Sequence, residues 1–179
     1  MVWGAYMCCV SVCLYECVGV HFSSEMIGVK RARSHVDEGF ISALKRPDQP
    51  KLNVMDSRPQ ANAVANMLRG GGYELAAYYK DVELEFNNIH NIHVMRNSLR
   101  AVTALCQSPP KTEKEWRAEL KEAKWLEHIR LVLLSAQRVV QLVDGEQQAV
   151  MVHCSDGYVA GSRTIVAAAH ALFPARARC

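Results

Sequence analysis

Ala149-Val150-Met151-Val152-His153-Cys154-Ser155-Asp156-Gly157 is the stretch of sequence that decides the fold class. Its first four residues are apolar and predict a short buried strand, and a loop containing Gly157 follows. An alanine-rich segment, 163–172, then predicts a helix. A strand, a glycine-containing loop and a helix in this order indicate an α/β domain with a site at the carboxyl end of the strand.

The chain before this stretch alternates between helical and strand patterns. Apolar residues spaced by three and four predict helices, whereas short apolar or alternating runs predict strands. The predicted helices are 36–44, 61–68, 95–105 and 111–143, and the predicted strands are 52–55 and 82–86. Segment 87–93 is polar and turn-like, and three glycines at 70–72 predict an open loop. We therefore predict an α/β fold with a central, mixed and partly parallel sheet flanked by helices.

Composition and charge limit the classes of function and of site. A chain of 179 residues, 50% hydrophobic and 22% charged, is sufficient for one domain with a hydrophobic core. The net charge of +3 is too small to indicate a nucleic-acid partner. Seven cysteines without a regular framework indicate a reducing compartment, and Cys13 and Cys17 lack a second ligand pair at zinc-site spacing. We expect no metal and no cofactor.

Residues 1–27 form an apolar, cysteine-rich leader that differs from the rest of the chain. Glu16 is the only Asp, Glu, Lys or Arg among the first 22 residues, so the basic segment of a signal peptide is missing. The run approaches the length of a membrane span, but Glu16 and the polar residues that follow it weaken that interpretation. We favour a strand-rich or non-native leader.

Cys154 is the candidate nucleophile. Backbone N–H groups converge where a strand opens into a loop and a helix, and such donors stabilise a thiolate that can attack phosphorus. A phosphatase of this type also needs an arginine six positions after the cysteine, to bind two phosphoryl oxygens. That position is Ala160, and the first arginine after the cysteine is Arg163. From the residues alone, an inert buried thiol is an equally good interpretation.

Four stretches in order resemble the myotubularin family of phosphoinositide phosphatases. The matching stretches are Asp56-Ser57-Arg58-Pro59 with Asn62 to Asn66 and Gly70-Gly71-Gly72-Tyr73-Glu74; Asn88 to Arg96; Trp125-Leu126-Glu127-His128-Ile129; and Val152 to Gly157. The resemblance covers 28–157 and implies a partial phosphatase domain with a fold like that of tyrosine and dual-specificity phosphatases. Residues 158–179 form a divergent tail.

The resemblance also implies an activity and a set of site residues. Family members remove the 3-phosphate from phosphatidylinositol 3-phosphate and 3,5-bisphosphate. Cys154 would be the nucleophile, Ser155, Asp156 and Gly157 would cradle the phosphate, and Asn66, Asn91 and Ile92 would contact the headgroup. Without the resemblance, local bonding to the backbone would be the preferred role of the two asparagines.

The loop after Gly157 departs from the family pattern. The family continues with Trp-Asp-Arg-Thr, whereas Val159 and Ala160 stand at the expected acid and arginine positions here. We therefore expect impaired catalysis. Two alternatives stay open: a pseudophosphatase that pairs with active family members, as a homodimer or heterodimer, and a fragment without function. The family also implies a cytoplasmic protein, peripheral at endosomal membranes, whose ligand is a phosphoinositide headgroup.

Overall fold

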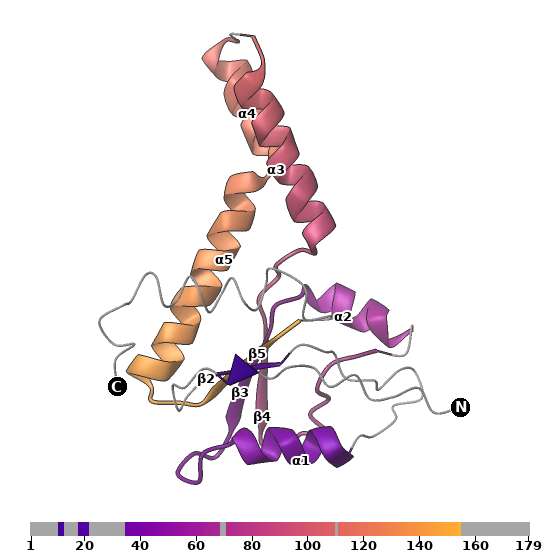
Figure 1. The fold of residues 1–179 in the computed structure, drawn as a ribbon, viewed down its shortest axis with the longest axis vertical. Coiled ribbons are helices and arrows are strands. Elements are labelled where there is room, and N and C mark those ends of the chain that lie inside the picture. The colour runs from indigo at the N-terminus through magenta and orange to yellow at the C-terminus, as the bar shows by residue number, and fades with distance from the viewer. Residues whose placement is uncertain (1–10, 13–17, 22–34, 69–70, 110, 155–179) are drawn as a thin grey trace.

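The computed structural model describes residues 11–12, 18–21, 35–68, 71–109 and 111–154. Its described elements are strands β1 (Ser11–Val12), β2 (Val18–His21), β3 (Leu52–Asp56), β4 (Val82–Phe86) and β5 (Val150–His153), helices α1 (His35–Leu44), α2 (Gln60–Met67), α3 (Ile92–Gln107), α4 (Glu113–Ala123) and α5 (Trp125–Val140), and the π-helical turn η1 (Gln141–Gly145). Helices and strands alternate through most of the chain, as the sequence predicts (Figure 1).

The five strands form one mixed sheet in the order β1-β2-β5-β3-β4. The β1–β2 pair is antiparallel, and the other three pairs are parallel. β5 therefore lies between β2 and β3, although it is the last described strand in the sequence. The predicted mixed, partly parallel sheet with flanking helices is confirmed.

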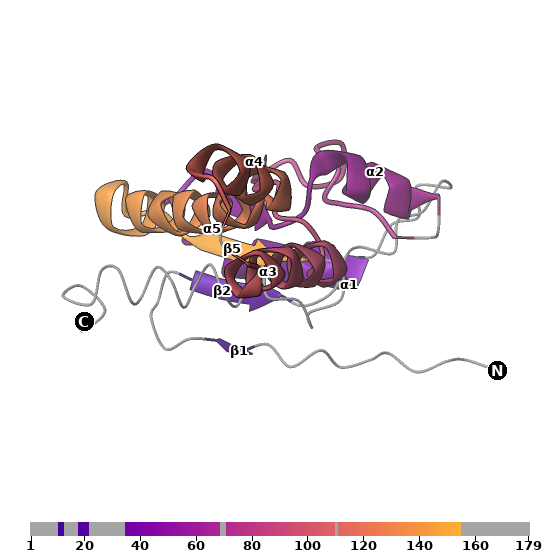
Figure 2. The same cartoon turned by 90° about the horizontal axis from the view of Figure 1, so that it is seen from above.

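Two hydrophobic clusters lie on opposite faces of the sheet, because successive side chains of a strand point to opposite sides. On one face, Met55, Val150 and Val152 pack with residues of α5 and η1. On the other, Val54 and Met151 pack with Ile41 of α1 and neighbouring residues. Both faces of β3 and β5 are thus covered, which is why all nine of their residues are buried. In Figure 2, α5 lies over β5.

Helices α3, α4 and α5 form an arm that connects β4 to β5 and extends beyond the sheet (Figure 1). The capping box of α4, formed by Thr112 and Glu115, sets its first turn. The sequence predicts one helical segment over 111–143, and this prediction is wrong. Lys124 adopts the left-handed conformation, with φ of 57°, and ends α4 immediately before α5 begins.

Other element boundaries differ from the predictions by a few residues. α3 begins at Ile92, inside the segment predicted as a turn, because Asn91 caps it: the Asn91 side chain accepts hydrogen bonds from the backbone N–H groups of His93 and Val94. β3 extends to Asp56, and β5 runs from Val150 to His153. The alternation of β4 is confirmed, since Glu83 and Glu85 are exposed between half-buried apolar residues.

Several large apolar side chains of the arm remain exposed. They are Val94 and Leu99 of α3, Trp116 of α4, and Leu126, Ile129, Leu133 and Leu134 of α5. Among the described residues, no helix is both long and apolar enough to span a membrane. The predicted helix at 163–172 and the tail 158–179 lie outside the described residues.

Candidate active site

Cys154 lies at the carboxyl end of the sheet, one residue after β5 ends. Its side chain is buried, with 3% of the residue exposed, and it forms no disulfide with another described cysteine. The parallel strands β2 and β3 flank β5, so Cys154 follows a central strand of the sheet and not an edge strand. In parallel sheets, this end of the strands is where ligands bind. The prediction that Cys154 directly follows a strand is confirmed.

Hydrogen bonds tie together the carboxyl ends of β5, β3 and β4. The backbone N–H of Ser57 donates to the carbonyl of His153 over 2.8 Å, and that of Asn87 donates to the carbonyl of Asp56 over 2.8 Å. The N–H of Ile89 in turn donates to the carbonyl of Ser57, also over 2.8 Å. The backbone leading into Cys154 is therefore held by the segment that follows β3, and that segment is held in turn by the one that follows β4.

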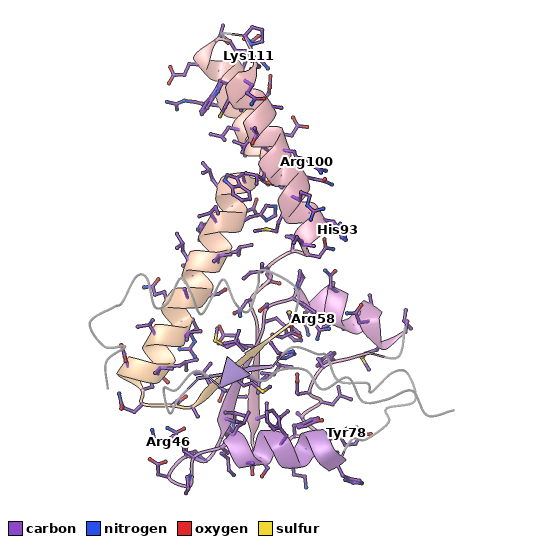
Figure 3. All side chains as sticks on the ribbon, in the orientation of Figure 1. Arg46, Arg58, Tyr78, His93, Arg100 and Lys111 are labelled. Atoms are coloured by element: carbon purple, nitrogen blue, oxygen red, sulfur yellow. The ribbon has the colours of Figure 1, made fainter. Side chains whose placement is uncertain are left out.

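A buried ion pair lies at the end of β3. The guanidinium of Arg58 binds the carboxylate of Asp56 in a two-pronged arrangement, with Nε 2.9 Å from Oδ1 and Nη2 2.6 Å from Oδ2. Nη2 also donates to the carbonyl of Gly72 over 2.8 Å. Arg58 therefore joins the end of β3 to the glycine loop before Tyr73. Figure 3 shows Arg58 at the end of the sheet from which α2 begins, opposite the end near Arg46.

A second buried pair joins that loop to β5. His153 Nε2 lies 3.2 Å from Glu74 Oε2, and both side chains are almost fully excluded from solvent. The contact is electrostatic and not a well-aligned hydrogen bond, since neither atom has a hydrogen-bond partner of good geometry. Burial favours neutral forms of both groups, but their mutual attraction opposes this.

The charges around His153 decide its protonation state. Burial alone would lower the pKa of His153, and Arg58 acts in the same direction, but the carboxylates of Glu74 and Asp56 outweigh both and raise this pKa to about 9. Burial would raise the pKa of Glu74, but the charge of His153 and that of Arg58 hold it below its ordinary value. His153 is therefore a cation and Glu74 an anion at neutral pH.

The predicted headgroup residues occupy elements that follow parallel strands. Asn66 lies in the last turn of α2, and its carbonyl accepts a hydrogen bond from the N–H of Gly71. Asn91 caps α3, and Ile92 is the first residue of that helix. α2 follows β3 and α3 follows β4, so all three residues come after the carboxyl edge that carries Cys154. Contact of these side chains with a headgroup stays a prediction.

The remaining predicted site residues cannot be placed in the same way. Ser155, Asp156 and Gly157 lie outside the described residues, as do Val159, Ala160 and Arg163. The described part of the chain contains no cluster of three or more histidine, cysteine or acidic side chains that could hold a metal ion.

Four buried charged residues next to Cys154 were not among the predicted site residues. Asp56, Arg58, Glu74 and His153 all belong to stretches that resemble the family, but the resemblance assigned them no role. Their positions near the candidate nucleophile and the glycine loop in the sequence did not show that they pair with one another. One signal in the sequence could have indicated them: Asp56 and His153 each end a strand whose other residues are apolar or neutral.

Comparison with known families identifies the domain. The family of the myotubularin-like phosphatase domain matches residues 15–174, which include Cys154 and the four buried charged residues. The chain belongs to the myotubularin-like phosphatase family. The family match begins before β2, so β2 and the strand-loop segment with Cys154 both fall within this myotubularin-like domain.

Curated relatives agree with this assignment. Over 138 residues, the chain is 44% identical to myotubularin of Rattus norvegicus and 43% identical to the phosphatidylinositol-3,5-bisphosphate 3-phosphatase MTMR2 of Mus musculus. It is 41% identical to myotubularin of Xenopus laevis over the same length. The matched segment is 76% of this chain but only 21–23% of the relatives, so the chain spans about a quarter of their length or less.

Proposed function

We propose that this chain carries the nucleophile and part of the headgroup site of a phosphoinositide 3-phosphatase, and that its catalytic turnover is arrested. The observation that carries the proposal is the position of Cys154, a buried thiol at the carboxyl end of a parallel strand inside the sheet. The substrate class follows from the relative named as a phosphatidylinositol-3,5-bisphosphate 3-phosphatase. The ligands are phosphatidylinositol 3-phosphate and 3,5-bisphosphate.

The reaction of such a site has two steps. The thiolate of Cys154 attacks phosphorus, the bond between phosphorus and the inositol oxygen breaks, and the leaving oxygen takes up a proton. Water then attacks the phosphocysteine, which releases phosphate and regenerates the thiol. Both steps need donors for the phosphoryl oxygens, and the first needs a proton donor.

Val159 and Ala160 occupy the positions where the family pattern has an acid and an arginine. Losing one donor that stabilises the transition state typically costs about a hundred- to a thousandfold in rate. Losing a general acid typically costs about a hundredfold or more. Binding of the headgroup depends less on these two groups than turnover does. We therefore expect the chain to bind the headgroup although it does not catalyse the reaction.

A pseudophosphatase that pairs with an active family member is the second candidate function. The exposed apolar side chains of the arm, among them Leu126, Leu133 and Leu134 of α5, favour this alternative, because large exposed apolar patches are typical of interaction surfaces. The proposed place of action is the cytoplasmic side of endosomal membranes, by peripheral association.

The test compares the parent chain with Cys154→Ser. Phosphate release is measured on vesicles containing phosphatidylinositol 3-phosphate, and binding is measured by sedimentation with the same vesicles and with vesicles containing phosphatidylinositol alone. We expect no release above the Cys154→Ser level and binding that requires the 3-phosphate. Phosphate release by the parent chain that disappears in Cys154→Ser and in Arg163→Ala would refute the proposed loss of catalysis. Equal binding to both kinds of vesicle would refute the headgroup site.

A pull-down with full-length mouse MTMR2 tests the second candidate. Stable association that is lost in a Leu126→Asp, Leu133→Asp double variant would support the adaptor function.

A further inference from the structure

The exposed face of α3 carries basic side chains and no acidic ones. The helix contains two arginines, Arg96 and Arg100, but no aspartate or glutamate, whereas α4 contains four glutamates and three basic residues. Residues three or four positions apart are neighbours on a helix surface, so His93, Arg96 and Arg100 form one stripe along α3. All three residues of this basic stripe are exposed.

The basic stripe is turned away from the rest of the arm. On the inner side of α3, the buried Ser98 donates a hydrogen bond from its hydroxyl to the carbonyl of Ala123. The stripe lies on the opposite side of the helix, and Figure 3 shows His93 and Arg100 on the side of α3 that is turned away from α5. A partner can therefore reach the stripe without displacing α4 or α5.

The two arginines of the stripe lack a counter-charge in the described part of the chain. Four other described arginines each form an ion pair with a carboxylate, namely Arg46, Arg58, Arg117 and Arg138. Like charges four positions apart repel each other and slightly destabilise a helix. Arg96 and Arg100 therefore favour an anionic partner outside these residues.

An exposed apolar side chain adjoins the stripe. Leu99 is three positions after Arg96 and is 45% exposed. Basic residues next to exposed apolar ones are typical of helices that lie on anionic membranes. The composition of this face thus favours a lipid surface over a purely polar partner.

The start of α3 lies at the end of the sheet that carries Cys154. β3, β4 and β5 are parallel, and α3 follows β4 with Asn91, a predicted headgroup contact, as its cap. Arg96 and Arg100 follow Asn91 by about 8 and 14 Å along the helix axis, at 1.5 Å per residue. A bilayer whose lipid headgroup reached Asn91 and Cys154 would present further headgroups over such distances.

We propose that the basic stripe of α3 docks on anionic phospholipid, the bulk lipid of the membrane that presents the phosphoinositide. The guanidinium groups of Arg96 and Arg100 bind phosphate and carboxylate oxygens of these lipids, which match the planar fork of arginine. This assignment rests on the proposed function, because it takes the substrate to be a membrane lipid. It adds the face with which the chain meets the membrane.

The test measures binding to vesicles that contain no phosphoinositide. The chain is sedimented with phosphatidylcholine vesicles that contain about 30% phosphatidylserine, and with vesicles of phosphatidylcholine alone. We expect the parent to bind only the former. The double variant Arg96→Gln, Arg100→Gln should bind them about tenfold or more weakly, since each basic residue near an anionic surface contributes about fivefold in affinity. The difference should be lost in about 0.5 M salt, which screens exposed charges.

The matched control is the double variant Lys114→Gln, Lys121→Gln. It removes the same two charges from exposed side chains of α4, and we expect it to bind as the parent does. Circular dichroism checks that both variants are folded. Equal binding by the parent and folded Arg96→Gln, Arg100→Gln would overturn the proposal. An equal loss in the control, or a parent that does not bind phosphatidylserine vesicles, would overturn it too.

A second measurement keeps the proposal testable even if the double variant does not fold. Arginines of the parent are modified with phenylglyoxal and quantified by peptide mass spectrometry. Phosphatidylserine vesicles should slow the modification of Arg96 and Arg100 severalfold but not that of Arg117 on α4, and equal rates with and without vesicles would overturn the proposal. Failure of the proposed function would look different: a 3-phosphate would add nothing to binding, while the dependence on Arg96 and Arg100 persisted.

Discussion

Asp56 and His153 are register partners at the last position of the β3–β5 ladder, and both are completely buried. Each is bound to a different counter-charge, Arg58 for Asp56 and Glu74 for His153. The end of the sheet that carries Cys154 is therefore stabilised by charge pairs, whereas the rest of β3 and β5 is stabilised mostly by apolar packing. The free energy of unfolding contributed by this end should therefore change with pH and with the loss of a single charged partner. The contribution of the apolar clusters should not change with pH.

The His153–Glu74 pair predicts an alkaline loss of stability. The pKa of His153 rises from 6.5 to about 9 on folding, so its contribution is complete below pH 6.5 and is lost as pH approaches 9. The pKa of Glu74 is lowered, so its contribution is lost only as pH falls below 4.5. Urea unfolding between pH 6 and 9.5 should show the parent losing up to about 1.4 kcal/mol per pH unit relative to Glu74→Gln. Parallel curves for the two proteins would show that His153 is not a buried cation.

Replacing Arg58 should be among the most damaging changes of a charged residue. Arg58→Leu removes the guanidinium from the buried carboxylate of Asp56, and breaking a buried ion pair costs about 3–5 kcal/mol. Arg117→Leu is the matched control, because the pair of Arg117 with Glu113 is exposed and should contribute less than about 1 kcal/mol. The double variant Asp56→Leu, Arg58→Leu should recover part of the loss in urea unfolding, since no charge is then left unpaired. A double variant less stable than Arg58→Leu would contradict this account.

Asn91 allows its structural role to be separated from its predicted role at the headgroup. Asn91→Ala removes the cap of α3 and should cost about 1 kcal/mol in thermal or urea unfolding. Asn91→Asp keeps an acceptor oxygen for the N–H groups of His93 and Val94, so stability should be close to that of the parent. If Asn91 contacts a phosphorylated headgroup, Asn91→Asp should nevertheless bind vesicles with phosphatidylinositol 3-phosphate more weakly, through charge repulsion. If Asn91→Asp binds these vesicles as well as the parent does, Asn91 caps α3 and does not contact the headgroup.

Packing against α5 should control the stability of the sheet. Met55 is fully buried in the cluster beneath α5, and Met55→Ala should cost about 2–5 kcal/mol. Leu126→Ala removes an apolar side chain of the same helix that is 61% exposed, and should change stability by less than about 0.5 kcal/mol. Chemical unfolding of the two variants measures the contrast. A loss for Leu126→Ala as large as that for Met55→Ala would mean that Leu126 is covered in solution.

The sequence predicted the apolar parts of the fold better than its charged parts. Val54, Val150 and Val152 lie in runs whose length and composition predict buried strands, and these strands are present. The break at Lys124 could not be predicted, because the helical pattern continues across it and a lysine rarely adopts the left-handed conformation. The start of α3 was missed because Asn91 was interpreted as part of a turn and not as a cap.

The candidate site was only partly accessible to sequence reasoning, for a physical reason. Cys154 could be located because a single strand and loop define its position. The partners of His153 could not, because the pairing depends on how β3, the glycine loop and β5 come together in space. Its residue type alone makes Glu74 look like an ordinary surface carboxylate, and its burial distinguishes it.

The place of β5 in the sheet has a consequence for the synthesis of the chain. β5 is inserted between β2 and β3, yet it follows β3 and the whole helical arm in sequence. A ribosome therefore releases β2, β3 and β4 well before the strand that joins β2 to β3 exists. Until then, β3 exposes one unpaired edge, and such edges invite aggregation or capture by chaperones. The nascent chain acquires its candidate nucleophile at the same moment as it closes its sheet.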